Sequence, residues 1–389
     1  MKAIKQINYF DFFLIVVGII LAIVIRYSLL DYKSVDFFKY TKVWYNTLKE
    51  NGFSIFSQNF SNYNPPYLYL LYFIARFLPG IPAVIATKLP SLIADFILAG
   101  FTYRIVRLKY ADSPFPLFAS FAVLFAPTII LNSAFWGQAD ALYTSALIGS
   151  IYFLLIKKYG FAMLLFGVSV SFKAQAVFLT PLLFTLFLRK EINWKYFLLI
   201  PMIMLIALLP AWIAGRSLID LLLIYPSQAG QYEQLTMHAP TIFAWIPDSG
   251  RFYNYFYPAG LIMAALTGIY FSLIVYRSHR ELTLPILVEL ALIIVMLMPF
   301  LLPKMHERNF YPADIISIIF VFYFPQFFFV PIVMSVISFF SYQPTLFEVE
   351  PLPISLLALL ILFLIVFLIR HAVTQLFDLG SKTEKFETQ

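Results

Sequence analysis

The chain has 389 residues, of which 61% are hydrophobic and 12% are charged, and its formal net charge is +7. Ordinary globular proteins carry about 25% charged residues, and a water-soluble shell of this size cannot bury 44 Phe and 25 Tyr. The composition therefore excludes a cytosolic enzyme, a secreted disulfide scaffold, a disordered protein and a coiled coil. The 27 Lys and Arg are scattered between apolar runs, which indicates membrane topology rather than nucleic-acid binding. With no Cys, thiolate nucleophiles and Cys-ligated metals are excluded.

The apolar runs predict an all-α integral membrane protein, a polytopic helical bundle formed by one domain over residues 1–389. We predict about twelve transmembrane helices, within a range of about ten to thirteen because 161–188 and 312–341 are crowded. Residues 10–30 are too long an apolar run for a cleaved signal peptide. The predicted spans lie near residues 10–30, 85–106, 115–132, 141–157, 161–173, 175–188, 195–214, 257–276, 283–303, 312–325, 327–341 and 352–370.

Basic residues in the short loops fall on one side of this map, which the positive-inside rule makes cytoplasmic. They are Lys2, Lys5, Arg104, Arg107, Lys109, Lys157, Lys158, Arg189, Lys190, Lys195, Arg277, Arg280 and Arg370. Twelve spans then place both termini in the cytoplasm. The two long segments between spans, 31–84 and 216–256, are both rich in aromatic residues and are predicted to be extracytoplasmic loops.

The first of these loops contains an amphipathic segment at residues 36–50. At 100° per residue, its aromatic and Leu side chains form one face and its Lys, Asn and Glu side chains the other, which predicts a helix in the membrane interface. The apolar face comprises Phe37, Phe38, Tyr40, Trp44, Tyr45 and Leu48. Asn51-Gly52 is a typical helix end, and Asn64-Pro65-Pro66 predicts a second short helix that runs to about Pro79.

Asp36 stands at the start of the interfacial helix, where two interpretations are open. Asp is among the best N-cap residues, so the side chain is explained by helix capping. Alternatively, it is a carboxylate at the lip of a membrane-level cavity that accepts a proton from a substrate hydroxyl.

Polar residues also occur at the predicted outer ends of spans. Gln138 and Asp140 follow Trp136-Gly137 in a short turn, where Asp140 either caps the next helix or faces a site. Lys173 and Gln175 interrupt a long apolar stretch, and a cation there requires a wet cavity or an anion. Asp95, inside the second span, is the alternative partner for Lys173 in a purely structural pair.

The densest polar cluster follows the span that ends at Pro303. Arg suits a phosphate because of its bidentate fork, and His can donate a hydrogen bond or a proton. A salt-bridged loop that reaches the interface is the alternative. The cluster contains Lys304, His306, Glu307, Arg308, Asn309 and Asp314.

The second long loop is rich in aromatic and amide side chains, which suit the binding of sugar rings but equally suit an ordinary interfacial loop. These residues are Tyr225, Gln228, Gln231, Tyr232, His238 and Trp245.

Nucleotide-binding and hydrolase motifs are absent from the sequence, including the Walker A and G-x-S-x-G patterns. The motifs present resemble those of the GT-C superfamily of polytopic glycosyltransferases, most closely the bacterial mannosyltransferase-like proteins related to the eukaryotic GPI mannosyltransferase PIG-V. They run in the expected order over about 30–315: Asp36-Phe-Phe with Trp44-Tyr45, Asn64-Pro-Pro-Tyr-Leu, Phe135-Trp-Gly-Gln-Ala-Asp140, Phe172-Lys-Ala-Gln175 and Met305-His-Glu-Arg308-Asn-Phe-Tyr311.

This resemblance implies an inverting transfer of a hexose, mannose or glucose, from a polyprenyl-phosphate sugar to an envelope glycan, lipid or protein on the extracytoplasmic face. It implies that Asp36 is the general base. It assigns the donor phosphate to Lys173, His306, Arg308 and Lys304, and the sugar or acceptor to Gln138, Asp140, Gln175, Glu307, Tyr232 and His238. Many relatives carry two adjacent acidic residues in the first loop, whereas Asp31 and Asp36 of this chain lie five residues apart. This spacing does not favour a metal ion bridged by two carboxylates, so we predict no metal and no other cofactor.

The expected partners are therefore a polyprenyl-phosphate sugar, a glycan or lipid acceptor and membrane lipid, without nucleic acid. The resemblance implies a bacterial plasma membrane. A transporter or flippase for a lipid-linked saccharide is the main alternative, since it also needs many spans and a basic cavity. It should, however, need polar groups through both leaflets, whereas here they gather at the outer face with Asp95 as the main exception. A lipid-linked oligosaccharide polymerase or ligase differs chiefly in its donor.

Overall fold

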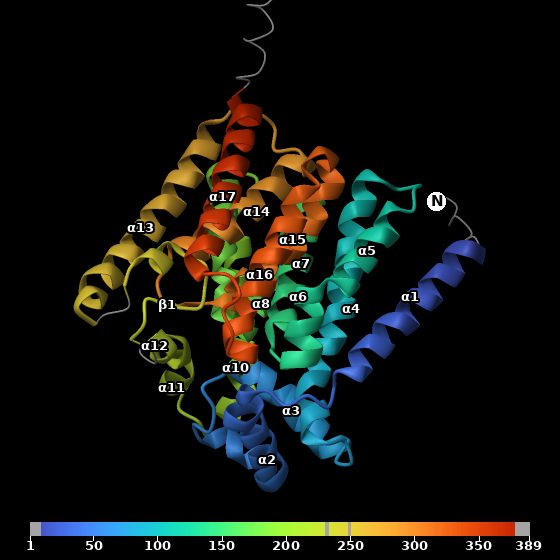
Figure 1. Cartoon of the computed structure of the whole chain (residues 1–389). Helices are drawn as coiled ribbons and strands as arrows, with labels where there is room; N and C mark the ends of the chain where they lie inside the picture. The colour runs from blue at the N-terminus through green and yellow to red at the C-terminus, as the bar shows by residue number, and fades with distance from the viewer. Residues whose placement is uncertain (1–8, 230–232, 248–249, 378–389) are drawn as a thin grey trace, which may run out of the picture.

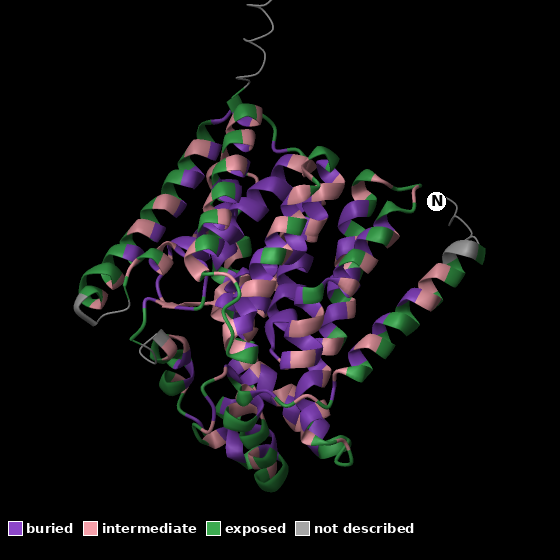
Figure 2. Ribbon diagram, viewed as in Figure 1, coloured by how far each residue is buried: buried purple, intermediate pink, exposed green. Residues whose placement is uncertain are grey.

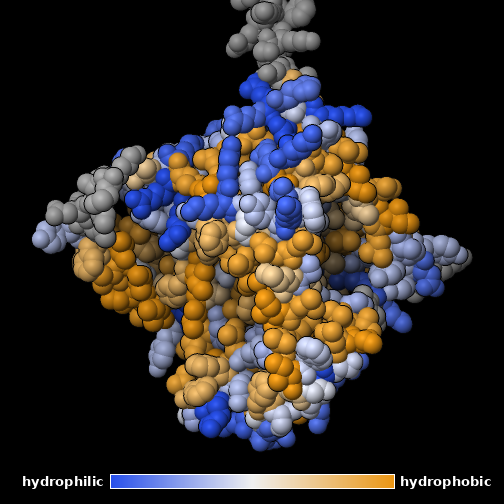
Figure 3. All heavy atoms as spheres, turned by 180° about the vertical axis from the view of Figure 1, so that it is seen from behind, coloured by the Kyte–Doolittle hydropathy of each residue, from blue (hydrophilic) through white to orange (hydrophobic). Residues whose placement is uncertain are grey.

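The computed structural model describes residues 9–229, 233–247 and 250–377 and is almost entirely helical. Its helices form one bundle, with the short helices of the first long loop gathered at one end (Figure 1). Buried residues are concentrated in the middle of the bundle (Figure 2). From behind, a broad hydrophobic band separates more hydrophilic ends (Figure 3), as expected of a protein whose belt faces lipid.

Six helices of the described residues are long and apolar enough to cross a membrane. They are α4 (Ala83–Lys109), η5 with α10 (Trp194–Leu198 and Leu199–Ile213), α13 (Gly250–Arg277), α14 (Leu284–Leu301), η8 with α16 (Pro325–Phe327 and Phe329–Phe347), and α17 (Ile354–Phe377). Five of the six coincide closely with predicted spans, while α13 begins at Gly250, inside the predicted second loop, rather than near residue 257.

A seventh span results if a bent pair of helices is counted as one. α5 (Phe115–Phe125) and the continuous α6 and η3 (Pro127–Ile130 and Leu131–Trp136) meet at an angle of 48°. Ala126 precedes Pro127 and is extended, with φ −61° and ψ 125°, because the Pro ring disfavours helical geometry in the preceding residue. The bend therefore follows from the sequence Ala-Pro and directs η3 toward the end of the bundle that holds the first long loop.

The other predicted spans contain helices that do not meet the same criterion of length and hydropathy. These are α1 (Tyr9–Ser28), α7 (Asp140–Leu155), α8 (Tyr159–Phe172), η4 with α9 (Ala174–Leu179 and Thr180–Leu188) and α15 (Tyr311–Tyr323). Of α1, only Phe12–Ser28 counts as a shorter apolar helix. Helices α7 and α15 are buried on nearly all sides, so they can be apolar without facing lipid. Length and hydropathy support six or seven crossings, and twelve crossings stay a prediction.

The first long loop folds largely as its pattern predicts. The π-helical turn η1 (Phe37–Thr41) leads into α2 (Lys42–Asn51), which ends at Gly52 with φ +65°; η2 (Gly52–Ser57) and α3 (Pro65–Phe77) follow. Trp44, Tyr45 and Leu48 of the predicted apolar face are buried against the rest of the protein. Phe38, in the π-helical turn, is exposed, as is compatible with the predicted membrane-interface face.

The second long loop contains short helices and one strand. α11 (Leu218–Leu222) and α12 (Ile224–Ala229) precede β1 (Thr236–Met237), and η6 (Ile242–Trp245) follows it. β1 pairs in parallel with β2 (Met305–His306), just before η7 (Glu307–Phe310), and the Lys304 amide donates to the Leu235 carbonyl at 2.7 Å. Backbone bonds therefore fix this loop to the segment that carries the densest polar cluster.

Candidate functional site

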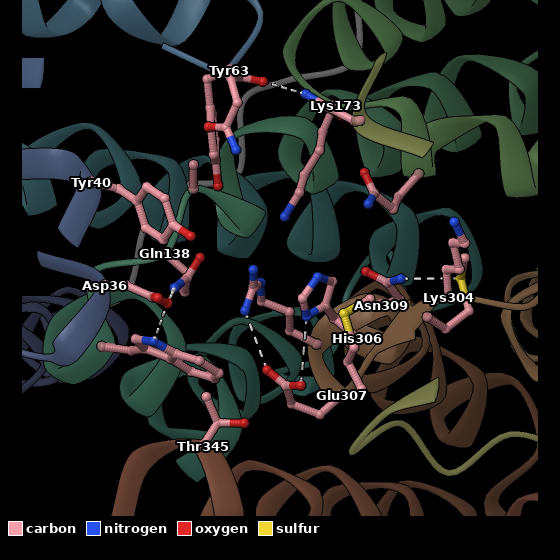
Figure 4. Close-up of a pocket in the computed structure, with 18 of the residues that line it drawn as sticks. Asp36, Tyr40, Tyr63, Gln138, Lys173, Lys304, His306, Glu307, Asn309 and Thr345 are labelled. Atoms are coloured by element: carbon pink, nitrogen blue, oxygen red, sulfur yellow. Dashed lines mark hydrogen bonds and ion pairs between the residues drawn. The ribbon is translucent and has the colours of Figure 1, made fainter. Parts of the chain in front are cut away.

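A cavity of about 570 Å³ lies where the two long loops meet the ends of η3, α8 and α14. Figure 4 shows Asp36, Tyr40 and Gln138 on one side of this space and His306, Asn309 and Lys304 on the other, with Lys173 and Thr345 at its remaining edges. In the sequence these residues lie in five separate segments. The fold brings the predicted residues among them to one cavity.

Asp36 is held by side-chain hydrogen bonds rather than by the helix that it begins. Its Oδ2 accepts from Trp136 Nε1 at 3.0 Å and from Gln138 Nε2 at 2.7 Å. Asp36 itself is helical and its side chain makes no capping bond, so the N-cap interpretation is wrong. Among the described residues none donates to Oδ1, which leaves one carboxylate oxygen for a ligand in the cavity.

The turn that supplies both donors depends on Gly137. Its φ is +82°, in the left-handed region that glycine adopts without a steric penalty, and this ends η3 after Trp136. Gln138 follows Gly137 and is fixed by a backbone contact, because Ser91 Oγ on α4 donates to the Gln138 carbonyl at 2.7 Å. In the sequence Trp136 is only part of a turn and of the motif that ends at Asp140, and its bond to Asp36 joins residues 100 positions apart.

Asp140 is buried at the centre of the cationic side of the site. One oxygen pairs with Lys173 Nζ, and the other accepts from Asn132 Nδ2 at 3.0 Å and lies 3.7 Å from Arg308 Nε. All three contacts are with side chains of other segments, and the N-cap of α7 is Ala139. The capping interpretation of Asp140 is therefore also wrong.

The alternative pairing of Lys173 with Asp95 is not found. Asp95 Oδ2 accepts from Arg26 Nε at 2.9 Å and from Ser133 Oγ at 2.6 Å inside the bundle. Asp95 is fully buried there and does not line the cavity. The pair instead anchors the end of α1 to α4.

Arg308 links the two acidic parts of the site. Its Nη1 donates to Glu307 Oε1 at 3.2 Å, and its guanidinium carbon lies 5.2 Å from the centroid of the Trp136 ring. The same indole therefore donates to Asp36 and stacks against a cation, a favourable arrangement for Trp. His306 Nδ1 lies 3.9 Å from Glu307 Oε2.

The protonation states of His306 and Glu307 follow from their surroundings. Burial lowers the pKa of His306 well below its usual value, and the nearby positive charges of Arg308 and Lys173 lower it further, so the imidazole is neutral at pH 7. Burial raises the pKa of Glu307 from 4.5 to about 7, against the opposing effect of Arg308. At neutral pH the site therefore contains a carboxyl group close to its titration midpoint.

We expect Glu307 to make folding stability decline with rising pH. The folded state keeps the Glu307 proton between pH 4.5 and about 7, where the unfolded chain loses it, so this contribution is fully present below 4.5 and is lost as pH rises through 7. The decline is at most about 1.4 kcal/mol per pH unit for one group. Thermal unfolding across this range should show a flatter pH profile for Glu307→Gln than for wild type. The exposed Glu50→Gln variant should keep the wild-type profile; equal slopes in wild type and Glu307→Gln would contradict the assignment.

The other predicted residues are placed as follows. Gln175 and Lys304 line the cavity, and Lys304 Nζ lies 4.7 Å from the centroid of the Tyr257 ring. His238 lines it too, with Nδ1 3.2 Å from Thr345 Oγ1. Tyr232 falls outside the described residues.

Several cavity residues were missed by the sequence reasoning. They are Tyr63, Asn64, Tyr257 and Thr345, which line the same space. Asn64 was given a role only as a helix start and as part of a motif, but its Nδ2 donates to the Ser171 carbonyl at 2.6 Å and so joins the first loop to the Lys173 turn. Thr345 lies beyond the stretch of about 30–315 that contains the motifs.

In the parts of the chain that the structure describes, no three His, Asp or Glu side chains are grouped so as to hold a metal ion. Metal independence stays a prediction. In comparisons with known proteins, no family model matches the chain, and no curated protein matches it.

Proposed function

We propose that the protein is an inverting glycosyltransferase that moves a hexose, mannose or glucose, from a polyprenyl-phosphate sugar to an envelope glycan, lipid or protein acceptor. The observation that carries this proposal is a cavity with a fixed carboxylate, Asp36, on one side and a cationic cluster on the other. Inverting transfer from a sugar phosphate requires these two functions, a base for the acceptor and charge stabilisation for the leaving group.

The acceptor step is assigned to Asp36. The acceptor oxygen attacks the anomeric carbon while its proton passes to Asp36 Oδ1, and the bond between that carbon and the phosphate oxygen breaks. The bonds from Trp136 and Gln138 to Oδ2 orient the carboxylate before the substrate arrives. Such preorganisation is what a general base needs, because its effect depends on reach and alignment.

The leaving phosphate takes the electron pair of the broken bond and is stabilised by Lys173, Arg308 and Lys304. Lys173 and Arg308 share Asp140, which keeps both cations in place when no phosphate is bound. Neutral His306 can donate a hydrogen bond to a phosphate oxygen without adding charge. The residues proposed to orient sugar and acceptor hydroxyls are Gln138, Asp140, Gln175, Glu307 and His238. Tyr232 is proposed for the same role on the basis of the sequence alone.

The proposed setting is a bacterial plasma membrane, with the cavity extracytoplasmic and both termini cytoplasmic. The donor is then already in the membrane, and neither a nucleotide nor a metal ion is needed. The alternative, a flippase, is less well supported, because Asp95 is closed off in an ion pair with Arg26 and offers no polar step toward the other leaflet.

A transfer assay tests this proposal. Purified full-length protein is given radiolabelled polyprenyl-phosphate mannose or glucose together with extracted envelope lipids and glycans. Labelled product from wild type, lost in Asp36→Asn while donor binding is retained, is the expected result. Donor binding without transfer to any acceptor, combined with movement of the donor across liposome bilayers, would instead establish the flippase.

A further inference from the structure

A second cavity, of about 790 Å³, lies away from the first, between α1, α4 and α5. Its walls are mainly apolar and include Ile15 and Ile19 of α1 and Leu117 and Leu124 of α5. Gly100 of α4 also lines it, and a Cβ built on this residue would have no heavy atom within 4 Å. The space between the helices is therefore not filled by side chains at that point.

The position of α1 explains why this cleft exists. Near its C-terminal end α1 is fixed by the Arg26–Asp95 pair, and at Gly18 it approaches α5 so closely that a Cβ would lie 2.2 Å from Phe121 Cε1. Toward its start α1 leans away from the bundle (Figure 1), and Phe12 and Phe13 are exposed. The cleft is thus held open by contacts at one part of α1 and is bounded by apolar side chains on both sides.

Two arginines give the cleft a charged end. Arg104 and Arg107 are exposed, lie one turn apart on α4 and both line the cavity. Their guanidinium carbons each lie 5.9 Å from an aromatic centroid, Tyr152 and Tyr103 respectively. Within the described residues neither arginine has a carboxylate at ion-pair distance, whereas Arg26 and Arg189 each do.

We propose that this cleft binds a phospholipid with an anionic head group. Its acyl chain lies between α1 and α4, and its phosphate contacts Arg104 and Arg107. An apolar slot that ends in a pair of arginines with no acidic partner among the described residues is more complementary to an anionic amphiphile than to a zwitterionic one. On the topology argued from the basic loops, these residues belong to the cytoplasmic side, whose leaflet carries anionic lipid.

Native mass spectrometry of the full-length protein in detergent tests the binding. Titration with dioleoyl phosphatidylglycerol should give an apparent affinity about tenfold higher than dioleoyl phosphatidylcholine, as the gain of charge-assisted contacts implies. The double variant Arg104→Gln, Arg107→Gln should lose this preference. Arg277→Gln, which removes an exposed arginine from the last turn of α13, should keep it.

The apolar half of the cleft has its own test. Gly100→Trp places a large side chain in the open space and should weaken phosphatidylglycerol binding while both arginines are present. Gly80→Trp is the matched control, because a Cβ at Gly80 also has no heavy atom within 4 Å and Gly80 lies outside the cleft. Glycerol 3-phosphate, which has the charge but no chains, should not displace the lipid. Equal binding of the two lipids to wild type, or equal losses in the arginine variants and in Arg277→Gln, would overturn the proposal.

Discussion

Replacing Asp36 by Asn is expected to lower kcat for sugar transfer by about a thousandfold, since positioned general bases contribute roughly 10²–10⁴ to rate. Asn has the same shape and can still accept hydrogen bonds from Trp136 and Gln138, so the cavity should keep its form. The proton acceptor for the attacking hydroxyl is what the variant loses. Single-turnover transfer with bound donor measures this step directly.

Asp31→Asn is the matched control for this measurement. Asp31 is an exposed carboxylate of the same loop, and it does not line the cavity, so its variant should transfer sugar at the wild-type rate. Donor affinity should be unchanged in Asp36→Asn. A rate within about threefold of wild type would remove Asp36 from the chemical step, because that ratio corresponds to less than about 1 kcal/mol.

Replacing Asp140 by Ala is expected to destabilise the fold by about 3–5 kcal/mol, the usual effect of removing one partner from a buried ion pair. Asp140 is 1% exposed and serves Lys173, Arg308 and Asn132 together, so the variant leaves two cations and an amide without their shared acceptor. The thermal unfolding midpoint of purified protein should fall clearly, while the exposed Glu50→Ala should leave it unchanged.

A double-mutant cycle separates the pair from the rest of the network. If Asp140 chiefly neutralises Lys173, then adding Lys173→Met to Asp140→Ala should cost less stability than Lys173→Met does alone. Arg308 keeps its bond to Glu307 in either background. Simple additivity of the two single effects would show that Asp140 and Lys173 are not energetically coupled.

The sequence predicted which residues belong to the site better than it predicted the hydrogen-bond and ion-pair partners of those residues. Hydropathy located the six helices that are long and apolar enough to cross a membrane, and polar residues that interrupt apolar ends identified Asp36, Asp140, Lys173 and the cluster at 304–308. These residues line one cavity or lie against it, because all come from helix ends and loops on one side of the bundle. Which partner each one has could not be inferred, since the partners are distant in the chain.

The pairings of Lys173 and Asp95 illustrate this limit. Both are charged groups near apolar spans, and a local pattern cannot tell which of several buried charges lies within 3 Å of another. The number of crossings was uncertain for a related reason. An apolar run such as α7 has the same composition whether it faces lipid or is enclosed by other helices, and only packing distinguishes the two.

The strand pair β1–β2 has a consequence for how the proposed recognition of an acceptor can diversify. Because the pairing of residues 236–237 with residues 305–306 uses backbone groups, the position of His306 does not depend on which side chains the second long loop carries. On the proposed function, substitutions in that loop can therefore alter the part of the cavity assigned to the acceptor while the proposed base and cations stay in register. Homologues with different acceptors are expected to vary most between residues 218 and 245 and least at the carboxylate and cations they face.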